Sequence, residues 1–199
     1  MIPFEYPNQP HARRHGPQRY ADYESYRPWL RDEFTFRCVY CLAREQWGRV
    51  TGEFGVDHFQ PQTRSPQQAL DYENLLYCCQ SCNALKGDAD TPDPCTALTA
   101  EHIRVKADGT IEGLTREARK IIRVLALDSE SCNRWRRLWL RNTELAAEHS
   151  RDQYVQLMGF PDDLPDLSRL RPPEGNSRLD GVEHCYFALR QRGELPETY

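Results

Sequence analysis

The sequence predicts an α+β fold. A small core of two strands and one helix is held by a metal ion with Cys ligands, and a β-hairpin and several α-helices flank it. Three observations predict it. Two Cys-x-x-Cys pairs, Cys38 with Cys41 and Cys79 with Cys82, enclose an insert that contains β-forming segments. Apolar residues alternate around an Asp-Gly turn at 102–115. Beyond this turn, apolar residues recur at helical spacing.

The chain divides into three predicted parts. Residues 1–20 are rich in Pro, His and Arg and show no periodicity, which predicts an extended arm. Residues 21–96 hold both Cys pairs and form the predicted metal-binding core. Residues 97–199 carry the hairpin and the remaining helices, as a C-terminal extension whose role the sequence leaves open.

Within the core, residues 21–37 predict a short helix that leads into the first Cys pair. Residues 54–59 have β character, and residues 74–77 return as a second short strand. A helix is expected from residue 79 to about residue 86. The predicted element is therefore strand, loop, strand and helix, with a Cys pair at each end.

In the extension, apolar periodicity predicts helices at about 115–128, 129–157 and 178–192. The four prolines between residues 159 and 177 predict a loop. These helices follow the hairpin directly, so the extension is expected to be mostly α-helical.

Charge excludes a global positive field, because the formal net charge is −4. Residues 104–141 nevertheless hold ten Lys or Arg against five Asp or Glu. Their WRRLWLR stretch suits a phosphate backbone, although core Trp residues on an amphipathic helix explain it better. No apolar run approaches the length of a membrane span, and the N-terminus lacks a secretory signal, so we expect a cytoplasmic protein.

Eight Cys residues in a reducing compartment point to metal binding before disulfides. Four thiolates from Cys38, Cys41, Cys79 and Cys82 make the closed tetrahedral shell of structural Zn²⁺. Cys78 offers a competing register, but its spacing to Cys82 is less suitable. The 37 residues between the pairs exceed a compact zinc ribbon, so a substantial element is inserted there.

The insert contains Asp57 and His58 near the end of its first strand. Adjacent strand residues point to opposite faces, so the two side chains can approach one substrate from two directions but not chelate one ion together. A buried, hydrogen-bonded pair that supports the zinc site is the alternative interpretation.

The motifs CVYC, VDHFQP, ENLLYCCQSCN and ALKG resemble, in order and spacing, the signature of the HNH endonucleases. The resemblance covers about a quarter of the chain, from Cys38 to Gly87. It implies a ββα-metal fold in a subtype stabilised by four Cys ligands.

The resemblance also implies the roles of four residues. Asp57 and Asn83 would hold a catalytic divalent ion, His58 would be the general base, and Asn74 would brace the loop and orient that base. Two oxygen ligands favour Mg²⁺ or Mn²⁺. Lys86 or Arg64 is a candidate to clamp a neighbouring phosphate.

The resulting hypothesis is an endonuclease that hydrolyses phosphodiester bonds in DNA, with RNA as an alternative substrate. A non-catalytic zinc module that binds nucleic acid or a protein partner is the alternative function; it would need the four Cys but not Asp57 or His58. The chain also resembles the nuclease component of bacterial anti-phage systems of the retron and Septu type, which implies an ATPase partner.

Overall fold

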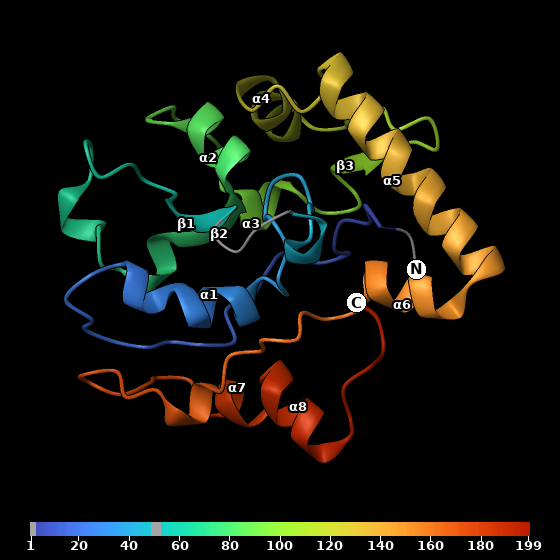
Figure 1. Cartoon of the computed structure of the whole chain (residues 1–199). Helices are drawn as coiled ribbons and strands as arrows, with labels where there is room; N and C mark the ends of the chain where they lie inside the picture. The colour runs from blue at the N-terminus through green and yellow to red at the C-terminus, as the bar shows by residue number, and fades with distance from the viewer. Residues whose placement is uncertain (1–2, 49–52) are drawn as a thin grey trace.

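The computed structural model describes residues 3–48 and 53–199. Within them, two small antiparallel sheets and a set of mostly short helices form the mixed architecture expected from the sequence (Figure 1). The strands are β1 (Phe54–His58), β2 (Leu75–Cys79), β3 (Ile103–Val105) and β4 (Ile111–Gly113). The helices are α1 (Arg27–Glu33), α2 (Gln80–Lys86), α3 (Pro94–Ala97), α4 (Arg116–Val124), α5 (Glu130–His149), α6 (Arg151–Met158), α7 (Asp180–Glu183) and α8 (Tyr186–Arg192).

Three predicted helices are shorter or divided in the structure. The helix expected at 21–37 ends early, because Thr35 and Phe36 adopt positive φ angles. The helix expected at 129–157 breaks at Ser150, which is extended and caps α6 with its side chain. The helix expected at 178–192 breaks before α8, because Cys185 is also extended. Backbone geometry at single residues sets these boundaries.

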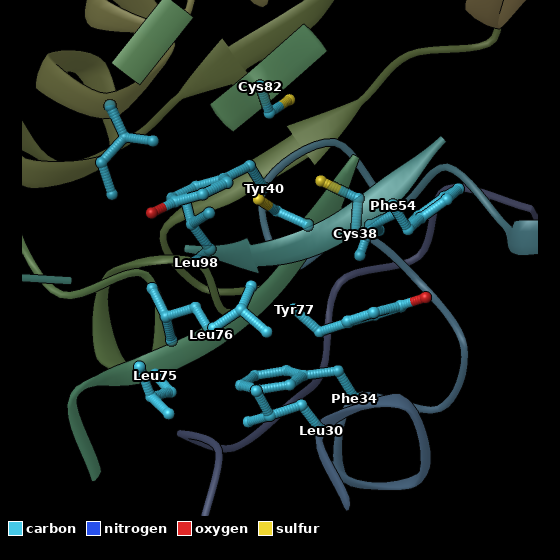
Figure 2. Close-up of a cluster of buried hydrophobic side chains, with 14 of the residues drawn as sticks. Leu30, Phe34, Cys38, Tyr40, Phe54, Leu75, Leu76, Tyr77, Cys82 and Leu98 are labelled. Carbon is cyan, nitrogen blue, oxygen red and sulfur yellow. The ribbon is translucent and has the colours of Figure 1, made fainter. Parts of the chain in front are cut away.

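The β1–β2 sheet is a hairpin whose register pairs Asp57 with Leu76 and His58 with Leu75. Leu75, Leu76 and Tyr77 are buried and lie near Leu30 of α1 (Figure 2). Helix α2 follows β2 directly, so strand, strand and helix form the small core predicted between the Cys pairs.

One continuous cluster of buried apolar side chains extends beyond this core. It includes Phe4 of the N-terminal segment, Leu76 of β2 and Ile121 of α4. The division of the chain at residues 20 and 96 therefore remains a prediction about its organisation, since all three parts contribute to one hydrophobic core.

The N-terminal segment is extended and docked on α1 through two buried carboxylates. Glu33 accepts hydrogen bonds from the backbone amides of Arg14 and His15, at 2.8 and 3.0 Å. Asp32 accepts from the side chains of the same two residues, each at 2.9 Å. The His11 ring lies 3.0 Å from Glu33. The arm is thus fastened next to the core by paired charges.

Substituting Glu33 with Gln should destabilise this junction in a pH-dependent way. Burial raises the pKa of Glu33, but hydrogen bonds from His11 and the Arg14 amide outweigh it and lower the pKa from 4.5 to about 2. A depressed carboxyl pKa gives stability that is present above pH 4.5 and lost as the pH falls towards 2. Urea unfolding should show that the variant loses about 3 kcal/mol of unfolding free energy at pH 7 and less at pH 3. An equal loss at both pH values would contradict the ionic origin, and exposed Glu101→Gln is the control.

None of the described helices is long and apolar enough to cross a membrane.

Candidate functional site

The four predicted zinc ligands converge on one point. The Sγ atoms of Cys38, Cys41, Cys79 and Cys82 all lie within 4.8 Å of one another, and those of Cys41 and Cys79 are 3.8 Å apart. A tetrahedral zinc ion with Zn–S bonds of about 2.3 Å has sulfur atoms about 3.8 Å apart. The arrangement therefore fits zinc, and the buried Cys78 lies outside the ligand set.

Local backbone structure forms each half of this site. In the first knuckle, the Leu42 amide donates to the Cys38 carbonyl, and Leu42 turns the chain with a positive φ angle of 60°. In the second, Cys79 is the N-cap residue of α2 and Cys82 lies in its first turn. A hydrogen bond from the Val39 amide to the Tyr77 carbonyl joins the first knuckle to β2. The zinc site and the hairpin are therefore one structural unit.

Asp57 is buried and accepts two hydrogen bonds, one from the first knuckle and one from the end of α2. The Tyr40 hydroxyl donates to Asp57 Oδ2 at 2.7 Å, and Lys86 Nζ donates to Oδ1 at 2.9 Å. Tyr40 lies between the two ligands of the first knuckle, and Lys86 ends the helix that begins at the second. Burial and then the Asp57 charge raise the pKa of Tyr40 well above its ordinary value, which keeps the hydroxyl a donor. The cysteine frame thus fixes the orientation of this carboxylate.

The prediction that Lys86 clamps a phosphate is wrong. Its side chain is 0% exposed, and its ammonium also donates to the His58 carbonyl at 2.7 Å. A group held this way balances the buried Asp57 charge and does not reach a surface substrate. Arg64 is exposed and remains the predicted phosphate contact.

His58 lies on the other face of β1, as strand alternation predicts. Its Nε2 lies 3.0 Å from the Ala69 carbonyl oxygen. Because a carbonyl oxygen can only accept a hydrogen bond, Nε2 carries the proton and Nδ1 carries the lone pair. The exposed Gln62 amide nitrogen lies 3.0 Å from Nε2 and 3.2 Å from Nδ1, and with Nε2 donating to Ala69 only Nδ1 can accept from it. Burial lowers the pKa of His58 below its ordinary value, which favours the neutral ring that a general base requires.

Asn74 makes three hydrogen bonds to the loop that joins β1 to β2. Its Oδ1 accepts from the Gln60 amide at 2.7 Å, and its Nδ2 donates to the carbonyls of Gln60 and Gln68, each at 3.1 Å. The loop carries Ala69, the acceptor of the His58 proton. Asn74 therefore holds the segment on which the orientation of His58 depends, while its effect on catalysis stays a prediction.

A cleft of about 280 Å³ brings three of the four predicted site residues together. Asp57, His58 and Asn83 all line it, and Asn74 is not among its lining residues. The remaining lining residues are Tyr23, Val56, Pro61, Gln62, Thr63, Gly87 and Asp88. Among the residues that the structure describes, none hydrogen-bonds to the Asn83 side chain, so its amide oxygen is available to a ligand in the cleft.

This donor set fits a hard divalent cation. A carboxylate and an amide oxygen reach one cleft that also opens to solvent, where water completes the shell that Mg²⁺ prefers. Each Asp57 oxygen accepts one hydrogen bond and retains a second lone pair. An ion can therefore bind Asp57 without removing Tyr40 or Lys86.

Sequence reasoning missed Tyr40, the Ala69 carbonyl and Gln62. No motif signals a backbone carbonyl as the partner of a ring nitrogen. The position of Tyr40 between two zinc ligands does not show that its hydroxyl points at Asp57.

One comparison with known proteins agrees with this geometry. The family model described as HNH endonuclease matches residues 38–89, which include the cysteine frame, β1, β2 and α2. A comparison with curated proteins gave no match. With its strand–strand–helix core and four converging cysteines, this segment of the chain is an HNH endonuclease domain.

Proposed function

We propose that the protein is a metal-dependent endonuclease that hydrolyses phosphodiester bonds in DNA. One observation carries the proposal. The imidazole of His58, with its tautomer set by Ala69, lines the same cleft as the oxygen donors Asp57 and Asn83. General base and ion ligands are thereby on one surface, as hydrolysis of a phosphodiester requires.

In this proposal, Asp57 and Asn83 would hold the divalent ion, which would supply positive charge to stabilise the negative charge that develops on the phosphate. His58 Nδ1 accepts a proton from a water molecule, after Gln62 swings aside. The resulting hydroxide attacks phosphorus, the bond from phosphorus to the 3′ oxygen breaks, and the 3′ oxygen takes up a proton from solvent water. The Ala69 carbonyl stabilises the ring as it becomes positively charged, because it already accepts the Nε2 proton.

The test is cleavage of a supercoiled plasmid by zinc-loaded protein with Mg²⁺ or Mn²⁺. We expect nicked or linear product, none when no Mg²⁺ or Mn²⁺ is added, and a rate about 10²–10⁴-fold lower for His58→Ala. Far-UV circular dichroism and zinc content should match between the two proteins. Equal cleavage by both would reject His58 as the base, and no cleavage by either would favour a non-catalytic zinc module.

The proposal retains a role in bacterial defence with an ATPase partner, which rests on the resemblance of the sequence. Full cleavage activity of the purified chain as a monomer would argue against an obligatory partner.

A further inference from the structure

We propose that the outward face of α4 binds the phosphate backbone of duplex DNA beside the cleaved bond. The inference rests on the proposed function, because it concerns how the same site receives its substrate. Its evidence lies outside the matched domain, in the extension whose role the sequence left open.

Helix α4 lies next to the candidate active site. Lys120 of α4 forms an ion pair with Asp90 at 2.7 Å, and Asp90 is two residues from Asp88, which lines the cleft. Leu125, just after α4, and Leu85 of α2 line a second cavity together. Helix α4 is therefore a neighbour of the helix that carries Asn83, and Figure 1 shows the two on the same side of the molecule.

The two faces of α4 differ sharply in chemistry. Ala118, Ile121 and Ile122 are buried in the core. The outward face carries four basic side chains, namely Arg116, Arg119, Lys120 and Arg123. Glu117 is the only acidic residue of this helix. The i, i+3, i+4 and i+7 spacing of the basic residues aligns them along one side.

Arg116 and Arg123 are the available charges of this face, because Lys120 pairs with Asp90 and Arg119 donates to two backbone carbonyls. Arg104 and Lys106 pair with Glu112, and Arg136 is buried against backbone carbonyls. Within the described residues, Arg116 and Arg123 form no ion pair. Arg116 and Arg123 are therefore exposed charges of this face that can reach a phosphate.

The composition of this face favours a duplex over a single strand. Single-stranded nucleic acid is held by aromatic side chains on which bases stack, and α4 has none. Trp139 of α5 packs against the core and stacks on Trp47 with ring centres 4.3 Å apart. Nine helical residues extend over about 13 Å, or roughly four base-pair steps of DNA, which suits contact with backbone phosphates alone.

The experiment measures binding of a fluorescent DNA duplex by anisotropy, across a salt series and without divalent ions. All proteins carry His58→Ala, so binding is read without cleavage. We expect Arg116→Gln with Arg123→Gln to weaken binding at least tenfold and to lower the slope of log affinity against log salt by about 2. The control is Arg169→Gln with Arg171→Gln, two exposed arginines between α6 and α7, which should bind as the parent does.

An unchanged slope in the α4 variant would overturn the proposal, as would a loss confined to single-stranded DNA or RNA. The result is separable from the proposed function. Duplex binding through α4 without cleavage would refute the proposed nuclease activity and support the proposed binding surface. Cleavage with unchanged duplex binding by the α4 variant would support the nuclease activity and refute the binding surface.

Discussion

Removing zinc should unfold the part of the chain that carries the candidate active site. All eight cysteines are free, so nothing covalent replaces the ion between the two knuckles. Cys38 and Cys82 belong to the main hydrophobic cluster, so loss of the ion would remove a link inside the core. Zinc binding supplies about 10–16 kcal/mol of folding free energy in small zinc-dependent domains.

The measurement is zinc content and thermal unfolding of Cys79→Ser beside Cys95→Ser. The first variant removes one of the four converging sulfur atoms, and the second removes a half-buried thiol outside the cluster. We expect about one zinc per chain in the Cys95 variant and a cooperative transition. The Cys79 variant should lose zinc and most of its cooperative unfolding. Retention of both in Cys79→Ser would show that the frame is not a zinc site.

Replacing Lys86 with Met should cost about 3–5 kcal/mol of unfolding free energy. The Lys86 ammonium is the only cationic group among the described residues that forms an ion pair with Asp57, whose side chain is 5% exposed. Methionine keeps the length of the side chain but leaves a buried carboxylate without its counter-charge. The loss should therefore come from charge and not from packing.

A double-mutant cycle separates these causes. Adding Asp57→Asn to Lys86→Met removes the unpaired charge, and urea unfolding should then recover at least half of the lost stability. Lys106→Met, on the exposed rim of the β3–β4 hairpin, should change stability by less than about 0.5 kcal/mol. A double variant no more stable than Lys86→Met would contradict the charge argument.

The chemistry of the site could be predicted where it depends on local spacing. Alternation along a strand predicts that Asp57 and His58 lie on opposite faces of it. The Cys-x-x-Cys spacing predicts that Cys38 and Cys79 bind one ion. The four-Cys frame was predicted in full for this reason, and Cys78 was correctly set aside.

What could not be predicted depends on contacts between distant residues. The docking of His15 on Asp32 and the bond from Tyr40 to Asp57 join segments that no periodicity relates. The sequence offers Lys86 as a candidate phosphate clamp, and only the fold shows that its ammonium pairs with the buried Asp57 carboxylate. The helix break at Ser150 was missed because apolar spacing continues across a single extended residue.

The most direct test of the central claim is Mn²⁺ binding, measured by the loss of the free-ion electron paramagnetic resonance signal in zinc-loaded protein. The account predicts one site that Asp57→Asn and Asn83→Ala each weaken at least tenfold, and that His58→Ala leaves within a factor of three of the parent. Zinc content and circular dichroism should be the same in all four proteins. Equal Mn²⁺ affinity in the parent and in Asp57→Asn would contradict a cation site on this carboxylate and, with it, the mechanism built upon it.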